Sequence, residues 1–274
     1  MVIIPLWAMK VSIRNPGEMP VLIRSMPCGD RWYLPAQRTF IPSGRNTYCM
    51  AKMKILGINA SPKAEKSQTR RLVMGVLDGA RQAGADVTFI DLCSLDIGYC
   101  TACGTCYAKG ECIRDDDYGA LYQKMMDADG IVLGSPNYID QVTAQMKTLL
   151  DRMADVIHCQ AFSGKYGCAV CTAGGSHADE VAEYMNTTLL NLGATTVGRT
   201  AVLVGANPDA IVGGEKQARE LGKKLAEAIK TKWKDPAQEA HHKERKEYFK
   251  RLISFNKDLW AHEYEYWKGL GEME

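Results

Sequence analysis

The chain has 274 residues, of which 46% are hydrophobic and 24% charged, and its formal net charge is +2. This length can bury a large core in one or two domains, and we expect one domain with extensions. The small net charge argues against nucleic acid as the principal partner. The apolar runs are far shorter than the roughly 20 residues of a membrane span. We therefore expect a soluble protein whose partner is neither nucleic acid nor a membrane.

The beginning of the chain differs in composition from the rest. Residues 1–50 contain six of the ten prolines and six Lys or Arg against two acids. They show neither a helical period nor strand alternation. We interpret residues 1–52 as an N-terminal extension, either poorly ordered or due to a translation start placed too early. An ordered arm and a targeting segment are the alternatives.

From Lys54 onward, short apolar runs alternate with helical stripes. Strands are expected at residues 55–58, 87–92, 130–134, 167–171 and 195–204, and helices over 72–80, 121–126, 142–157, 181–189 and 212–229. Strands separated by helices predict a doubly wound α/β fold with a five-stranded parallel sheet and helices on both faces. We assign residues 53–230 to this domain. Its ligands are expected at the carboxyl ends of the strands.

The first strand leads directly into a hydroxyl-rich loop that opens a helix, Asn59 to Thr69. The Gly-x-Gly-x-x-Gly motif of a dinucleotide-binding fold is absent here. Lys63 and the free N–H groups of the helix favour an anion, and a phosphate monoester suits such a loop. The alternative is that Ser67 or Thr69 merely caps the helix.

Two further strand ends carry small residues, in Gly134 to Ile139 and in Thr172 to Ser176. Both lie where a doubly wound sheet opens its ligand crevice. They offer backbone amides and one aromatic face, so a flat ring system could lie across them. Each loop taken singly also fits an ordinary turn.

The most specific feature is a cysteine-rich loop over residues 93–115. It contains Cys100, Cys103, Cys106 and Cys112, separated by two, two and five residues. Four such thiolates can hold an iron-sulfur cluster, whereas structural zinc usually takes two separated pairs. Zinc and free redox-active thiols remain the alternatives. Clustered thiols in a long α/β chain indicate a reducing compartment, so we expect a cytoplasmic protein.

Another Cys-x-x-Cys pair, Cys168 and Cys171, lies within an apolar strand. Its side chains are expected to point to opposite faces of the sheet as small core residues. Residues 231–274 are expected to form a helical extension after a polar linker that ends at Asp235 and Pro236. Its aromatic residues predict packing on the body of the chain or on a partner subunit. His241 and His242 are expected to be solvated rather than to bind a metal.

These motifs resemble the iron-sulfur flavoproteins, a flavodoxin-like branch of the NADPH-dependent FMN reductases. The resemblance covers residues 53 to about 203 and rests on the three strand-end loops and the four cysteines. It implies that the FMN phosphate is held by Ser61, Lys63, Ser67, Gln68 and Thr69. It implies that the ribityl chain and isoalloxazine are bordered by Ser135, Pro136, Asn137, Tyr138, Ile139, Ala173, Gly174 and Gly175. The four cysteines would hold one [4Fe-4S] cluster.

The resemblance implies a flavin-dependent oxidoreductase without a catalytic side chain, because its chemistry is centred on the flavin. Electrons would pass between a low-potential ferredoxin-like donor or NAD(P)H and an acceptor such as a quinone or an oxygen species. A homodimer or homotetramer is implied, in which the cluster of one subunit approaches the flavin of a neighbour. Two alternatives stay open: an NAD(P)H-dependent FMN or quinone reductase without a cluster, and a non-catalytic binding module with a zinc-loaded loop.

Overall fold

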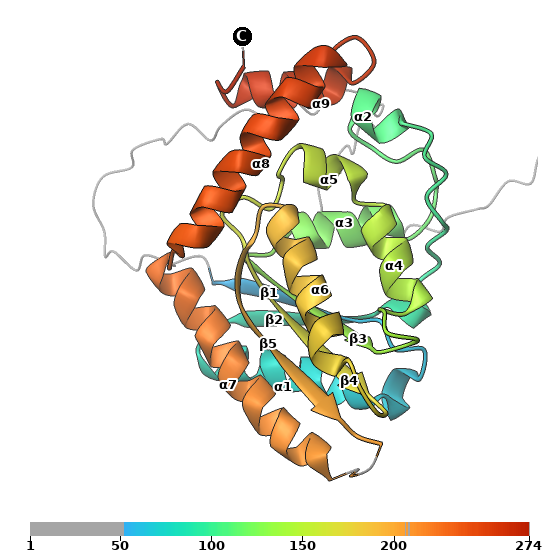
Figure 1. Ribbon diagram of the computed structural model, residues 1–274, viewed down its shortest axis with the longest axis vertical. Helices are drawn as coiled ribbons and strands as arrows, with labels where there is room; N and C mark the ends of the chain where they lie inside the picture. Colours follow the sequence, from blue (N-terminus) through green and yellow to red (C-terminus); the bar gives the residue numbers. More distant parts are fainter. Residues whose placement is uncertain (1–51, 206, 208, 274) are drawn as a thin grey trace, which may run out of the picture. The chain divides into compact units, whose positions relative to one another are not determined.

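A five-stranded parallel sheet forms the centre of the structure, a computed structural model that describes residues 52–205, 207 and 209–273 (Figure 1). All but the last residue of the predicted N-terminal extension lie outside the described residues. The strands are β1 (Lys54–Asn59), β2 (Asp86–Asp91), β3 (Gly130–Pro136), β4 (Tyr166–Ala173) and β5 (Thr195–Leu203). Their order is β2-β1-β3-β4-β5, which is the flavodoxin-like order. The predicted fold class is confirmed.

Helices cover both faces of the sheet. They are α1 (Gln68–Gln82), α2 (Thr105–Lys109), α3 (Tyr118–Asp127), α4 (Ala144–Asp151), α5 (Ala154–His158), α6 (Ala178–Asn191), α7 (Ala210–Thr231), α8 (Pro236–Phe255) and α9 (Ala261–Gly269). The helices α1 and α7 pack on one face, and α3 to α6 pack on the other. No helix of the described ranges combines the length and the hydrophobicity that crossing a membrane requires.

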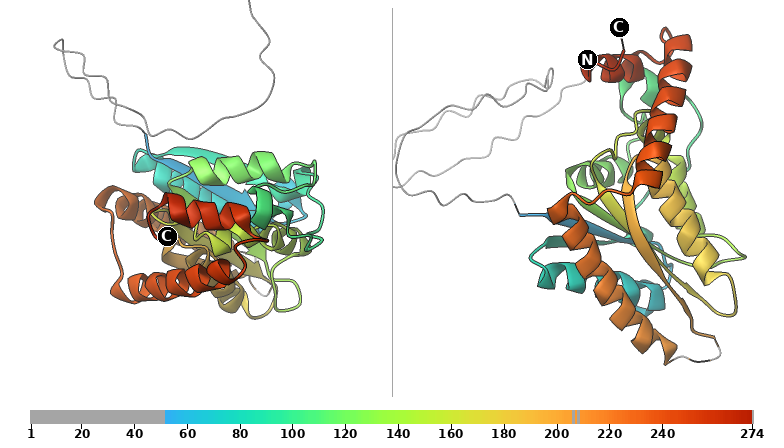
Figure 2. Two further views of the ribbon diagram at one scale, coloured as in Figure 1. Left: turned by 90° about the horizontal axis from the view of Figure 1, so that it is seen from above. Right: turned by 60° about the vertical axis from the view of Figure 1, so that its left-hand side comes forward.

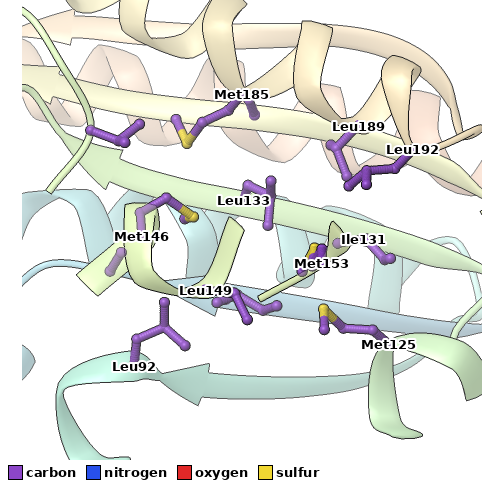
Figure 3. Close-up of a cluster of buried hydrophobic side chains, with 14 of the residues drawn as sticks. Leu92, Met125, Ile131, Leu133, Met146, Leu149, Met153, Met185, Leu189 and Leu192 are labelled. Carbon is purple, nitrogen blue, oxygen red and sulfur yellow. The ribbon is translucent and has the colours of Figure 1, made fainter. Parts of the chain in front are cut away.

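Each face of the sheet has its own hydrophobic core. Figure 3 shows one of them, in which Leu133 of β3 lies among side chains such as Met146 and Met185. On the opposite face α1 and α7 approach so closely that a Cβ on Gly222 would lie 1.9 Å from the Val76 carbonyl oxygen. Cys171 belongs to the first core and Cys168 to the second, and both are fully buried. Their expected orientation toward opposite faces is confirmed.

The single helix predicted over residues 142–157 is wrong, because the chain breaks at Arg152 into α4 and α5. The apolar stripe continues through the break, so periodicity alone did not reveal it. The Arg152 carbonyl accepts a hydrogen bond of 2.6 Å from the Tyr118 hydroxyl. The Arg152 side chain forms an ion pair with Asp116. Tertiary contacts thus stabilise the break.

The predicted polar linker is present, because residues 232–235 lie between α7 and α8 and the helix α8 begins at Pro236. Asp235 caps α8 by accepting a hydrogen bond from the Gln238 N–H at 2.9 Å, and Pro236 occupies the first helical turn, where proline is tolerated. The Gln238 side chain pairs with both backbone groups of Thr196, at 2.8 and 2.9 Å. This contact fixes the start of α8 to the edge strand β5.

Two predictions for the extension have different outcomes. His241 and His242 are half-buried rather than fully solvated, and they form hydrogen bonds with Asn191 and with the Ala194 carbonyl at 3.0 and 3.2 Å. The predicted aromatic packing occurs within the chain, where Phe249 and Trp267 are almost fully buried. In both views of Figure 2, α9 lies beside the short helix α2.

Candidate functional site

Three loops meet at the carboxyl ends of β1, β3 and β4. The Ala60 N–H donates to the Gly134 carbonyl at 2.8 Å, which joins the first two strand ends. The Asn137 N–H donates to the Thr172 carbonyl at the same distance, which joins the second and third. Neighbouring β1 and β3 are the point where the strand order reverses, and such points open the ligand crevice of this architecture.

The hydroxyl-rich loop after β1 presents three buried side chains, those of Ser61, Ser67 and Thr69. Ser67 caps α1, since its Oγ accepts a hydrogen bond from the Arg70 N–H at 3.0 Å. Ser67 therefore caps the helix, and its binding of phosphate stays a prediction. A hydroxyl has one donor and two acceptor positions, so this Oγ keeps its proton for a second partner. Thr69 lies at the first turn of the same helix, whose N-terminus attracts anions.

The Thr69 hydroxyl lies 2.6 Å from that of Thr172 at the end of β4. Sequence reasoning missed Thr172, although its place at a strand end was a usable signal. The other two predicted residues of this loop are less enclosed. Lys63 is exposed, and the Gln68 side chain accepts a hydrogen bond from Arg71. The buried hydroxyls and the exposed lysine thus surround one helix N-terminus.

The loop after β3 has a buried and an exposed part. Ser135 is fully buried, and its Oγ accepts a hydrogen bond of 3.0 Å from the Thr143 N–H. The Thr143 hydroxyl in turn donates a hydrogen bond of 2.8 Å to the Ala60 carbonyl. Thr143, which was not predicted from the sequence, therefore connects the loops after β1 and β3. Tyr138 and Ile139 project into solvent, Ile139 with 99% exposure and a φ of +52°. A left-handed conformation is unfavourable for a β-branched residue, and such strain often marks functional sites.

The loop after β4 is open. Gly174 and Gly175 are exposed, and nothing lies within 4 Å of a Cβ built on either, while Ala173 is buried below them. His177, at the end of this loop, lies 2.6 Å from the Asp140 carboxylate of the loop after β3. The two loops therefore form one continuous rim beside the hydroxyl-rich loop.

The cysteine-rich loop turns sharply on both sides of the short helix α2. Ala102, Gly104 and Gly110 have positive φ angles of 52°, 72° and 79°. Cys100, Cys103, Cys106 and Cys112 all line one cavity of about 30 Å³. Within the described part of the chain, three or more metal-binding side chains do not converge on a point where one ion could sit. The four thiols therefore share a cavity without forming a single-ion site.

The four thiols have different environments. Burial, with the nearby charges of Asp155 and Glu263, raises the pKa of Cys106 to about 12. Hydrogen bonding with Thr105 lowers the pKa of the exposed Cys103 below its ordinary value. The buried Cys106 thiol therefore holds its proton more firmly than the exposed Cys103 thiol.

The C-terminal extension packs on the cysteine-rich loop. Tyr107, next to Cys106, stacks on His158 with ring centroids 4.7 Å apart and lies 5.0 Å from Trp260. Glu263 of α9 is fully buried and lies 3.0 Å from His158 Nδ1. Burial raises the pKa of Glu263, and the hydrogen bond with His158 opposes this shift. Sequence reasoning predicted packing for the tail but did not reveal that α2 is its partner.

Comparison with known proteins identifies the family of the chain. A family model described as NADPH-dependent FMN reductase matches residues 53–209. The chain belongs to this family. An "Iron-sulfur flavoprotein" of Archaeoglobus fulgidus is 38% identical over 226 residues, which cover 80% of this chain and 99% of that protein. Another, from Methanocaldococcus jannaschii, is 32% identical over 195 residues, covering 65% and 98%.

A solved structure agrees at the level of the fold. The NAD(P)H:quinone oxidoreductase from Methanothermobacter marburgensis matches with a TM-score of 0.51 and 18% identity over 64% of this chain and 98% of its own. The resemblance to the iron-sulfur flavoproteins is thus confirmed, and the chain is a flavin-dependent oxidoreductase.

Proposed function

We propose that this protein binds FMN at the three loops and one [4Fe-4S] cluster at the four cysteines, and passes electrons between them. A low-potential ferredoxin-like donor or NAD(P)H would supply the electrons, and a quinone or an oxygen species would accept them. The observation that carries the proposal is that all four cysteines line one cavity, in a chain of the NADPH-dependent FMN reductase family. Flavodoxin-like folds bind FMN at the ends of the central strands.

The residues of the three loops fit FMN. Ser61, Ser67 and Thr69 would donate hydrogen bonds to the phosphate at the start of α1, with Lys63 adding a positive charge. The exposed Tyr138 and Ile139 would cover the ring system on one side, and the open backbone at Gly174 and Gly175 would admit it on the other. The loop from Ser135 to Ile139 and the residues Ala173 to Gly175 therefore remain our proposed border of the flavin.

The donor set of the second site fits an iron-sulfur cluster. In a cubane each cysteine binds its own iron, so the four sulfurs surround the cluster rather than converge on one point. The cavity of about 30 Å³ is small, and the exposed Cys100 and Cys103 would move outward to admit the cluster. Bound FMN can take up two electrons or one, whereas the cluster exchanges one at a time. The protein side chains hold, orient and shield these groups.

We also propose a homodimer or homotetramer. Exposed apolar side chains adjoin both sites: Tyr99 and Ile113 flank the cysteines at 75% and 68% exposure, and Ile139 lies at the flavin loop. Exposed apolar patches of this kind often mark interfaces. Light scattering of the cofactor-loaded protein gives the mass of the assembly, and a monomer would contradict this part of the proposal.

Anaerobic purification tests the whole proposal. The absorption spectrum, together with iron, sulfide, zinc and FMN assays, should give about four irons and one FMN per chain. FMN without iron would instead favour a cluster-free NAD(P)H:quinone reductase, the activity named for the solved structure from Methanothermobacter marburgensis. Stoichiometric zinc without FMN would favour the non-catalytic binding module.

A further inference from the structure

Arg152, which the proposed function leaves unused, lies beneath the cysteine-rich loop. Its side chain is 1% exposed. Its Nη2 donates a hydrogen bond of 3.1 Å to the Cys112 Sγ, and its Nη1 donates 2.8 Å to the Gly98 carbonyl. Both nitrogens also contact the Asp116 carboxylate, at 3.1 and 2.7 Å. The buried Arg152 guanidinium therefore connects Gly98, before the first cysteine, with Cys112 and Asp116 near the end of the loop.

The orientation of the guanidinium is fixed from several sides. Its carbon lies 4.4 Å from the centre of the Tyr118 ring. Asp116 is itself held by hydrogen bonds from the Gly98 and Tyr118 N–H groups, at 3.0 and 3.1 Å. Because arginine has a rigid planar fork of donors, these contacts aim one N–H at the sulfur. A lysine could supply the charge but not the whole set of directions.

Arg152 also follows the helix that connects the two proposed cofactor sites. The helix α4 is preceded by Thr143, which contacts the loops after β1 and β3. Eight residues of helix span about 12 Å. Thr143, at the start of α4, thus contacts the proposed flavin site, and Arg152, at its end, contacts the proposed cluster site.

We propose that Arg152 positions Cys112 and raises the reduction potential of the cluster, an inference that rests on the proposed function. Reduction adds one negative charge to the cluster and its thiolates. A buried N–H donor on a ligand sulfur stabilises the reduced form more than the oxidised form, because hydrogen bonds to the sulfurs and local charge set the potential. The cluster would then accept an electron more readily than without the arginine.

The test compares the variants Arg152→Gln and Arg152→Lys with the wild-type holoprotein. An EPR-monitored redox titration measures the ratio of reduced to oxidised cluster at a fixed solution potential. We expect this ratio to fall at least tenfold in Arg152→Gln, which is 59 mV for a one-electron couple. The lysine variant keeps the charge and should show a smaller decrease.

Arg114→Gln is the matched control. Arg114 also contacts Asp116, at 3.7 Å, and borders the same cavity, but its side chain is 40% exposed. Among the described residues, no hydrogen bond joins it to a cysteine sulfur. Because solvent and salt screen an exposed charge, its removal should change the ratio much less than tenfold.

The outcomes separate the inference from the proposed function. Wild-type protein without iron would refute the proposed cluster. If the wild type holds the cluster and Arg152→Gln has the same cluster potential, only the role of Arg152 is overturned. If Arg152→Gln does not retain its cluster, the lysine variant decides: a lowered potential supports the inference, and a wild-type potential overturns it.

Discussion

The double substitution Ser67→Ala and Thr69→Ala tests the flavin site most directly. If both hydroxyls donate to the phosphate, two hydrogen bonds to a charged group are lost, each contributing about 1.5 to 3 kcal/mol. Their sum of about 3 to 6 kcal/mol weakens FMN binding by roughly 10² to 10⁴ fold. Ser67 can act in this way while it caps α1. Thr69 can do so if the Thr172 hydroxyl donates to it, which leaves its own proton free.

The same substitutions also lower the stability of the apoprotein. Loss of the Ser67 cap costs about 1 kcal/mol, and loss of the Thr69 to Thr172 hydrogen bond costs about 0.5 to 1.5 kcal/mol. Asp235→Ala is the matched control, because it removes the cap of the distant helix α8. Isothermal titration of apoprotein with FMN measures the affinity, and urea unfolding measures the stability. Unchanged FMN affinity in the double variant, with stability lowered as in the control, would refute the phosphate role.

Three further predictions concern the cysteines, the tail and pH. Replacing Cys100, Cys103, Cys106 or Cys112 by Ala should remove iron but retain FMN in metal and flavin assays, whereas Cys168→Ala and Cys171→Ala should retain both. Trp260→Ala should lower the free energy of unfolding by about 1 to 3 kcal/mol and speed the loss of iron. Phe255→Ala, at an exposed residue, is the control, and equally fast iron loss in both variants would contradict a role of Trp260 in supporting the cysteine-rich loop. Burial lowers the pKa of His242, so the unfolded state binds its proton first as pH falls below about 6.5. Acidification should therefore destabilise the wild type more than His242→Gln in thermal melts, and parallel pH curves would exclude this contribution.

Local signals were sufficient to predict the sheet. The central strands β1, β3 and β4 are short apolar runs buried on both faces, and the alternation with helices allows few topologies. The same reasoning failed at Arg152, where the apolar stripe of residues 142–157 continues through a break. That break depends on the Tyr118 hydroxyl and on Asp116, both distant in sequence. Long-range contacts of this kind leave no period in the chain.

The three candidate loops were predicted from strand ends and the cysteine set from its spacing, and both signals are local, whereas the individual FMN residues followed from the family resemblance. The structure places the hydroxyl-rich loop and the loops after β3 and β4 at one edge of the sheet. Thr143, which supports them, was not predicted because an isolated threonine has no distinctive pattern. Thr172 was not singled out as a site residue, although it lies in the predicted loop after β4. The interpretation of residues 1–52 as an extension stays a prediction, as does the role of each site residue.

The C-terminal extension explains how so exposed a loop keeps a defined conformation. The only helices in residues 93–115 are the end of the short helix Leu92–Ser94, at the start of this segment, and α2, in its middle. Local hydrogen bonds alone therefore hold the segment weakly. Arg152 holds the loop through its hydrogen bonds to the Gly98 carbonyl and the Cys112 sulfur, and α9 packs on α2. Gly110, which ends α2, has a φ of +79°, and a Cβ there would lie within 2.6 Å of the His262 ring. A larger residue would therefore strain the backbone and displace the ring. Trp260, the residue before α9, lies against Tyr107 with the ring centroids 5.0 Å apart, and both rings lie beside His158. The tail that seemed peripheral in the sequence is therefore part of the support of the proposed cluster site.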